Sequence, residues 1–330
     1  MLVSTVIPPI KPHHRELPLK VGTRGSPLAR AQTATFLELL ERFCPVLRGM
    51  HVFEEHIIVT TGDAVQNRPL AEIGGKGLFA KEIHEALAAR RIDFAVHSLK
   101  DLETVLPPGI TLACTLKRED ARDVLVLAPG HAQADPADPF AVLPKGAKIG
   151  SASVRRQAQL KHARPDLEFA LLRGNVGTRL AKIEAGELDA TLLAFAGLRR
   201  LGLADKASVV LSPEQMVPSA CQGIVGITAR SEDLELLELL SGIEDPEAKA
   251  VATAERALLG ALDGSCRTPI GGYARLLEDG SLHLTGLVAR ADGSFLLRRS
   301  VTGSVADAEI MGRDLGLSLK ADSPDDIFAP

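Results

Sequence analysis

Apolar runs alternate with stretches of helical periodicity from Leu17 onward, and this alternation is typical of an α/β architecture. In the first part of the chain it predicts strands in LKVGTR, HIIVTTGD, DFAVHSLKD and DVLVLA. Ser26 and Pro27 supply an N-cap and a first helical residue, so a helix should follow the first strand. Another helix is predicted from about Leu78 to Arg90. Four prolines between Pro129 and Lys145 indicate an exposed excursion.

The middle of the chain repeats this order of elements. Strands are predicted in KIGS, LEFALLRG and LDATLLAF, and helices begin near Val154 and Val176. PSACQGIVGITAR has the pattern of a strand that returns after this second unit, so we expect the first domain to be discontinuous. The expected boundaries are a disordered leader (1–17), a first α/β domain (18–117 and 218–240), a second, anion-binding α/β domain (118–217) and a third domain (241–330).

The third domain has a different pattern. A helix around Ala248 to Leu262 precedes the loop DGSCRTPIGG, and three strands joined by two Asp-Gly turns then predict an antiparallel meander. With a terminal helix from about Val305 to Leu319, this domain is α+β. We expect the last residues, ADSPDDIFAP, to fray.

Composition narrows the class of protein. The chain has 330 residues, 45% of them apolar and 24% charged, which is typical of a folded globular protein and excludes disorder as its main state. The net charge is −4 and aromatics make up 3%, so neither the basic surface nor the stacking rings of a nucleic-acid-binding protein are expected. The apolar runs are shorter than the ~20 residues of a membrane span.

The N-terminus and the cysteines favour a reduced, cytoplasmic chain. The first apolar stretch follows no positively charged segment and contains prolines, so a secretory signal is not expected. The cysteines are widely spaced, with neither a CxxC motif nor a histidine at metal-ligand spacing, and we expect no disulfide frame and no metal site. They are Cys44, Cys114, Cys221 and Cys266.

Arginine, serine and glycine gather where predicted strands lead into helices, which is where open α/β sheets bind ligands. Three junctions carry such groups: Thr23, Arg24 and Ser26; Ser151, Ser153, Arg155 and Arg156; Arg173, Gly174, Asn175 and Arg179. Helix N-termini, hydroxyls and guanidinium groups all favour carboxylate or phosphate. Each serine could instead be a cap and each arginine a surface charge, but agreement among three junctions favours one anionic ligand. Residues 151–200 hold nine Lys/Arg against five Asp/Glu, a local charge of +4.

Two further segments carry candidate chemistry of a more ambiguous kind. IGGKGLF does not satisfy GxxxxGK[ST], because Gly77 stands where the hydroxyl should be, so nucleotide binding is not predicted. Lys76 and Phe79 could belong to a segment covering a cleft, or to a tight turn before a helix. Cys266 lies beside a cation in a glycine-flanked loop, where a thiolate could act as a nucleophile or attachment point, or be merely structural.

HSLKD ends a predicted strand with Asp101, and this carboxylate would be an exceptional negative charge among basic junctions. It is suited to stabilising a developing cation or managing a proton. The alternative is a helix cap or an ion-pair partner. Asp63 and Asp123 are weaker candidates for the same role.

Together these residues belong to a set of motifs that resembles the porphobilinogen deaminase family. The motifs occur in the family's order over about residues 18–302: TRGSPLA, TTGD, IGGKGLFAKEI, DFAVHSLKDL, KREDARDVLV, GSASVRRQAQL, RPDL, LRGNVGTRL, FAGLRRLG, CQGIVGI, AERALL and GSCRTPIGGYA. The resemblance implies two periplasmic-binding-protein-like α/β domains and a smaller α+β C-terminal domain with a three-stranded antiparallel sheet.

The resemblance also implies an activity. The family is a transferase (hydroxymethylbilane synthase) that joins four porphobilinogen molecules head to tail, releases ammonia each time and makes hydroxymethylbilane for haem and related tetrapyrroles. It carries a dipyrromethane cofactor, attached through a thioether to a cysteine that matches Cys266. Porphobilinogen would be the small-molecule partner, and we expect a monomer without metal, membrane or nucleic acid. The runner-up is a non-catalytic anion-binding module of the same fold.

Matching the motifs residue by residue implies the roles of the site. Asp101 would be catalytic. The cofactor would be bound by Cys266, Ser98, Lys100, Ser151, Ser153, Arg155 and Arg156. The substrate would be bound by Arg24, Ser26, Arg173, Arg179, Arg200, Lys76 and Phe79. Four positions depart from the family's common residues, which are proline for Glu103, a small residue for Cys221, Glu for Thr228 and a polar residue for Gly25.

Overall fold

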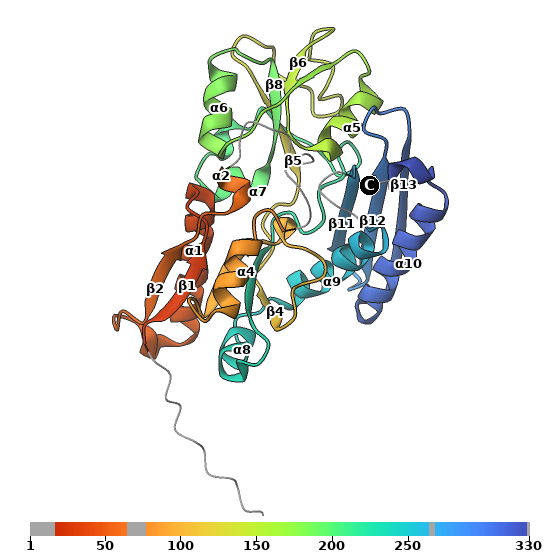
Figure 1. Cartoon of the computed structure of the whole chain (residues 1–330). Coiled ribbons are helices and arrows are strands. Elements are labelled where there is room, and N and C mark those ends of the chain that lie inside the picture. Colours follow the sequence, from red (N-terminus) through yellow and green to blue (C-terminus); the bar gives the residue numbers. More distant parts are fainter. Residues whose placement is uncertain (1–16, 65–76, 264–267, 329–330) are drawn as a thin grey trace, which may run out of the picture.

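Three β-sheets organise the chain, and we call the parts built on them the first, second and third units (Figure 1). The computed structural model describes residues 17–64, 77–263 and 268–328. The expected leader up to residue 16, Lys76 and Cys266 lie outside the described residues.

The first sheet has the strand order β2-β1-β3-β10-β4. β1 is parallel to β2 and β3, whereas β10 runs antiparallel to both β3 and β4. Because β10 follows the whole second unit in the chain, the first sheet is completed from beyond it. Its strands are β1 (Leu19–Thr23), β2 (Phe53–Ile57), β3 (Phe94–Ser98), β4 (Ile110–Thr115) and β10 (Val225–Arg230), and its helices are α1 (Pro27–Phe43), α2 (Thr61–Ala64), α4 (Lys81–Ala88) and α8 (Leu234–Ser241).

The second sheet repeats this arrangement in the order β7-β6-β8-β5-β9. β6 is parallel to β7 and β8, and β5 runs antiparallel to β8 and β9. The two sheets therefore share one topology. The strands are β5 (Asp123–Leu127), β6 (Lys148–Gly150), β7 (Glu168–Ala170), β8 (Ala190–Ala194) and β9 (Val209–Val210), and the helices are α5 (Val154–Ala163), α6 (Val176–Glu184) and α7 (Phe195–Arg200).

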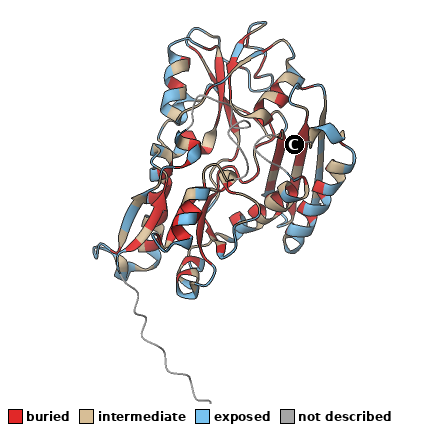
Figure 2. Ribbon diagram, viewed as in Figure 1, coloured by how far each residue is buried: buried red, intermediate tan, exposed pale blue. Residues whose placement is uncertain are grey.

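The third unit is an antiparallel meander covered by two helices. Its strands are β11 (Ile270–Leu276), β12 (Leu282–Ala289) and β13 (Leu296–Gly303), and its helices are α9 (Pro246–Ala261) and α10 (Ala308–Ala321). The helices pack closely, since a Cβ on Gly312 would lie 2.1 Å from the Ala254 carbonyl oxygen. Figure 2 shows buried residues along the strands and on the inward faces of the helices. The mixed α/β class with a separate three-stranded antiparallel sheet is confirmed.

Two segments cross between the first and second units, and they are bonded to each other. The Glu119 amide, in the crossing from β4 to β5, donates to the Gly223 carbonyl, in the crossing from β9 to β10, at 3.0 Å. A buried ion pair connects these crossings to the third unit, because Arg118 Nη1 lies 2.7 Å from Glu255 Oε1 on α9. The Glu255 side chain is fully buried and also accepts the Cys221 and Ala274 amides.

The second strand was predicted from HIIVTTGD, but β2 lies at Phe53–Ile57, and Thr61–Ala64 is a short helix. The Thr60 hydroxyl donates to Asp63 at 2.8 Å, so this polar stretch bonds locally instead of extending the strand. The sequence pattern did not predict β4 or β9. β4 was missed although its ladder with β10 completes the sheet.

Two segments that were expected to be loose make specific contacts. The excursion 129–145 is exposed along most of its length, as predicted, but it buries Phe140 and Leu143, whose carbonyls accept hydrogen bonds from Arg164 at 2.7 and 3.2 Å. Near the C-terminus, Asp326 pairs with Arg290 at 2.8 Å, so the prediction of fraying was wrong for the residues described.

A search of the described residues found no helix that combines the length and apolar character needed to cross a membrane.

Candidate active site

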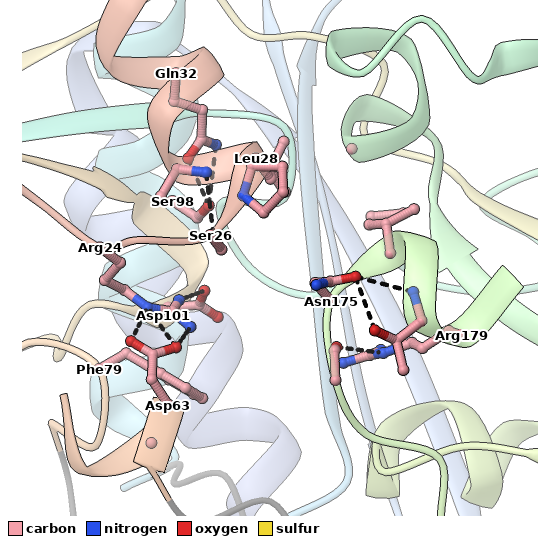
Figure 3. A pocket seen from close by; sticks show the side chains of 18 of the residues that line it. Arg24, Ser26, Leu28, Gln32, Asp63, Phe79, Ser98, Asp101, Asn175 and Arg179 are labelled. Atoms are coloured by element: carbon pink, nitrogen blue, oxygen red, sulfur yellow. Dashed lines mark hydrogen bonds and ion pairs between the residues drawn. The ribbon is translucent and has the colours of Figure 1, made fainter. Parts of the chain in front are cut away.

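A cavity of about 520 Å³ is lined by residues of both the first and the second unit. The first unit contributes the end of β1, the start of α1 and the end of β3. The second unit contributes the start of α5, the start of α6 and the α7 region. Figure 3 shows Arg24, Asp63 and Asp101 on one side and Asn175 and Arg179 on the other. The basic strand–helix junctions therefore meet at one place.

Arg24 follows β1 and is held over the cavity by acidic and aromatic partners. Its Nε lies 3.0 Å from Asp63 Oδ2, and its Nη1 lies 3.9 Å from Asp101 Oδ2. Its guanidinium also stacks on Phe79, 4.2 Å from the ring centroid. Burial opposes the charge, but the bond to Asp63 and the charge of Asp101 leave the pKa of Arg24 above its usual value. Arg24 is therefore a fixed cation beside Asp101.

The helix that follows Arg24 starts as its sequence predicts. The Ser26 hydroxyl accepts a hydrogen bond from the Ala29 amide at 3.2 Å, and Pro27 is the first helical residue. Ser26 also lines the cavity. Gln32, one turn and a half further along α1, reaches the same space and bonds to Ser98 Oγ at 3.0 Å. Gln32 was not among the residues predicted from the sequence. The one indication in the sequence was a polar residue in the first half of the helix that begins after Ser26.

Asp101 lies at the end of the short 3-10 turn Leu99–Asp101 that continues β3. Its side chain is one-third exposed and lines the cavity with its neighbour Lys100. Lys100 Nζ donates to Gln222 Oε1 at 3.2 Å. Burial lowers the pKa of Lys100, Asp101 opposes this and Arg156 adds to it, and the resulting pKa is about 8. A carboxylate and a readily deprotonated amine thus stand side by side.

The facing wall is cationic. Arg156, Arg173 and Arg179 line it, and Asn175 caps α6 by accepting the Thr178 amide at 2.9 Å. Burial, together with the charges of Arg156 and Arg173, lowers the pKa of Arg179 to about 10. The Arg156 Nε is buried without a hydrogen-bond partner. An anionic ligand would offset the repulsion among these arginines and would offer the Arg156 Nε an acceptor.

The charge balance of the lining identifies the class of ligand. Among the described residues, five cationic side chains (Arg24, Lys100, Arg156, Arg173 and Arg179) face the cavity with two carboxylates (Asp63 and Asp101). Asp63 is already bound to Arg24 and Thr60, and these contacts outweigh burial and lower its pKa. Cations therefore outnumber carboxylates in the described lining, although Arg156 is also paired with Asp123 at 2.7 Å, and this excess favours a ligand with more than one carboxylate.

His97 also lines the cavity, but its contacts indicate a structural role and not proton transfer. Its Nε2 lies 2.9 Å from the Thr228 hydroxyl on β10. Burial, with the nearby charges of His84 and Arg24, lowers the pKa of His97 to about 3. Thr228 thus provides a neutral partner for a neutral imidazole.

Some of the residues predicted from the sequence do not line this cavity. Arg155 is buried, with Nη1 2.8 Å from Asp123 Oδ2 and 2.6 Å from the Val217 carbonyl oxygen. Arg200 donates to the carbonyl of Gly223, in the crossing from β9 to β10, at 2.6 Å. Ser151 and Ser153 shape the start of α5: the Ser153 amide donates to Ser151 Oγ, and Ser153 caps the helix.

Asp123, one of the weaker catalytic candidates, is fully buried between two arginines. Burial would raise its pKa, but Arg155 and Arg156 hold it well below the usual range. Replacing it by alanine leaves two buried guanidinium groups unpaired, so we expect Asp123→Ala to lower the free energy of unfolding by about 3–5 kcal/mol. Urea denaturation measures this.

The matched control for Asp123 is Glu184, which pairs with Lys206 at 2.8 Å on the exposed surface of the same unit. Glu184→Ala should cost less than about 1 kcal/mol. If both variants cost equally little, the buried pair does not stabilise the second unit.

No group of histidine, cysteine, aspartate or glutamate suited to a metal ion was found among the residues described.

Comparisons with known proteins agree on one family. Residues 19–238 match the model "Porphobilinogen deaminase, dipyromethane cofactor binding domain", and residues 249–321 match "Porphobilinogen deaminase, C-terminal domain". Porphobilinogen deaminase of Syntrophobacter fumaroxidans is 45% identical over 91% of this chain and 94% of its own. The Paracoccus denitrificans protein of that name is 45% identical over 94% and 96%.

The similarity extends to a plant protein and, weakly, to a solved structure. The chloroplastic porphobilinogen deaminase of Oryza sativa subsp. japonica is 45% identical over 92% of this chain and 83% of its own. The periplasmic VFT2 domain of Bordetella pertussis BvgS is 14% identical and superposes with a TM-score of 0.40, covering 71% of this chain and 92% of that one.

Proposed function

The chain belongs to the porphobilinogen deaminase family, and on this premise we propose how its described residues carry out the reaction. It is a transferase, hydroxymethylbilane synthase, that joins four porphobilinogen molecules with release of ammonia, and it uses a dipyrromethane cofactor. The observation that supports the roles below is that the carboxylate of Asp101 lines a cavity whose described lining carries five cationic side chains against two carboxylates.

The cavity fits a dipyrromethane. Each pyrrole ring carries an acetate and a propionate, and the excess of cations and the unpartnered Arg156 Nε match such a set of carboxylates. When bound, the cofactor supplies the pyrrole carbon at which the chain of rings is lengthened. We propose that Lys100, Arg156 and Ser98 hold its side chains, with Cys266 as the covalent attachment. Arg155, Ser151 and Ser153 then support Arg156 and the start of α5 from behind.

Substrate binding is proposed for the cations around Asp101. Arg24, Arg173 and Arg179 bind the carboxylates of porphobilinogen, and Ser26 and Phe79 complete that part of the wall. Arg200 supports this binding through its hydrogen bond to the Gly223 carbonyl in the crossing from β9 to β10, and Lys76 is proposed from its motif match. The binding of every ring by similar guanidinium groups suits a growing chain of identical units.

Asp101 is proposed to perform the chemistry. Loss of ammonia from porphobilinogen leaves positive charge on the pyrrole, and a carboxylate that hydrogen-bonds the ring N–H stabilises that charge. Arg24 Nη1 lies 3.9 Å from Asp101, whereas Arg24 Nε bonds to Asp63 at 3.0 Å, so we propose that the Asp101 carboxylate is left to interact with the substrate. With a pKa lowered to about 3, His97 is neutral and adds no positive charge beside Asp101.

The remaining assignments complete the proposal. We propose domains at 18–117 with 218–240, 118–217 and 241–330, which the exchange of β10 into the first sheet supports. We also propose a cytoplasmic monomer that acts without metal, membrane or nucleic acid.

The experiment that tests this function is an intact-mass measurement combined with a porphobilinogen-consumption assay. The purified chain should carry the mass of two linked pyrroles and should consume porphobilinogen with release of ammonia. An unmodified chain that binds but does not consume porphobilinogen would instead support the anion-binding module.

Lys100 should give the reaction a pH dependence. Its pKa of about 8 lies below the usual lysine value of 10.5, so the amine is charged below pH 8 and loses its charge as the pH rises through that value. Because the neutral amine attracts carboxylates less, kcat/KM for porphobilinogen should fall above about pH 8. Lys100→Arg should weaken this fall, since arginine stays charged. The pH profile of both enzymes measures it, and identical alkaline limbs would exclude Lys100 as the group responsible.

A further inference from the structure

Helix α9 is attached to the segment that follows Asp101 by one guanidinium group. Arg256 Nη2 donates to the Glu103 carbonyl oxygen at 2.6 Å and to the Thr104 carbonyl oxygen at 3.0 Å. Both acceptors are main-chain atoms, so the contact restrains the path of the backbone itself. Burial lowers the pKa of Arg256, whereas the nearby Cys221 and Glu103 raise it. A largely buried cation that bonds to carbonyls is costly to disturb.

Asp101 lies between this contact and a second anchor. On the N-terminal side of Asp101, the Leu99 amide donates to the Ile224 carbonyl at 3.0 Å. This bond attaches the start of the 3-10 turn to the crossing from β9 to β10. The Leu102 amide then closes the 3-10 turn by donating to the Leu99 carbonyl at 3.1 Å. On the C-terminal side, Arg256 bonds two and three residues beyond Asp101. The carboxylate is therefore held on a short turn fixed at both ends.

Apolar packing acts at the same place, and it defines the competing explanation. Leu99 and Leu102 are buried in one cluster with Val251 and Ala252 of α9. If that packing alone fixed the turn, the Arg256 bonds would add little to the position of Asp101. Leucine packing tolerates small rotations, however, whereas two hydrogen bonds from one planar group fix a direction.

We propose that Arg256 is a positioning residue for Asp101, an inference that rests on the catalytic role proposed above for that carboxylate. Arg256 holds the backbone after Asp101 against α9, the helix that ends five residues before Cys266 in the sequence. One side chain thus joins the segment carrying the catalytic carboxylate to the helix leading to the cofactor cysteine. Arg256 does not touch the substrate in this proposal, and it acts through the geometry of Asp101.

The test compares Arg256→Gln and Arg256→Lys as purified, cofactor-loaded enzymes. Displacing a catalytic group by about 1 Å costs up to about 100-fold in rate, so Arg256→Gln should lower kcat by about 10- to 100-fold. KM should change by less than about threefold, because the binding arginines are untouched. Arg256→Lys keeps a charged donor and should recover part of the loss. Lys249→Gln, which removes an exposed cation from the same helix, is the control and should leave kcat unchanged.

A double-mutant cycle shows whether the effect passes through Asp101. In Asp101→Glu the carboxylate is already displaced, so Arg256→Gln should then lower kcat by a much smaller factor than in the wild type. Equal factors in the two backgrounds overturn the proposal, as does an Arg256→Gln enzyme within about twofold of wild-type kcat. If Arg256→Gln fails to fold, the same cycle run with Arg256→Lys decides the question. The catalytic role proposed for Asp101 is tested separately: normal turnover in Asp101→Ala would contradict that role, whatever the Arg256 variants show.

Discussion

Replacing Cys266 by serine is expected to abolish turnover and remove the added mass of two linked pyrroles from the purified chain. A serine hydroxyl is far less ionised than a thiol near neutral pH, so it is a much weaker nucleophile for forming the link. Without the covalent link the cavity retains its cations, but the growing chain of pyrrole rings is no longer attached to the protein. Intact mass and porphobilinogen consumption, measured on the same preparation, give the result.

The matched control for Cys266 is Cys44, a half-buried cysteine in the turn after α1. Cys44→Ser should keep both the added mass and the turnover. Cys114 and Cys221 are less suitable controls, because both are buried and burial raises the pKa of each thiol to about 12. An added mass that persists in Cys266→Ser would place the attachment on another residue.

The element pattern of the fold was predictable because most strands and helices are bounded by residues with clear local preferences. Ser26, Ser153 and Asn175 each cap a helix by accepting an amide three residues on. β2 was misplaced because Val59, which looks like a buried strand residue, lies beyond the end of the strand and is 70% exposed. Periodicity cannot show which apolar residues the tertiary structure leaves on the surface.

The candidate site was predictable as a set of junctions but not in its detailed contacts. Arg155 and Arg156 are adjacent in the sequence, yet successive residues of a helix point about 100° apart. Consequently only Arg156 lines the cavity, although both arginines pair with Asp123, and Arg155 also bonds to the Val217 carbonyl. The pairing of Arg24 with Asp63, which are 39 residues apart, likewise depends on the sheet and could not be read from spacing.

The position of β10 explains why the two cation-bearing units face each other. β10 is antiparallel to β3 and pairs Val225 with Ser98, just before the turn that carries Asp101. The chain that reaches β10 has already crossed from the second unit, and Gln222 in that crossing bonds to both Lys100 and Asp123. The crossing thus connects the turn that carries Asp101 in the first unit directly to the buried arginine pair of the second.

Replacing Asp101 by alanine is expected to lower kcat by at least about 100-fold while the fold is retained. The side chain is one-third exposed, and its nearest ion pair, with Arg24, is 3.9 Å long, so its loss should cost less than about 1 kcal/mol of stability. Arg24 keeps its bonds to Asp63 and its stacking on Phe79. What disappears is the negative charge that stabilises the pyrrole cation after ammonia leaves.

The assay for this variant must separate chemistry from cofactor loading, since both depend on the same cavity. Turnover is therefore expressed per mole of cofactor-bearing chain, and the thermal unfolding midpoint is compared with the wild type. Asp101→Asn, which keeps the size and hydrogen-bonding shape but not the charge, should lose nearly as much activity as alanine, because the charge does the chemistry. If Asp101→Asn turned over near the wild-type rate, the carboxylate would serve only to orient its neighbours, and the catalytic charge would have to be sought in Asp63, the other carboxylate among the described residues that line the cavity.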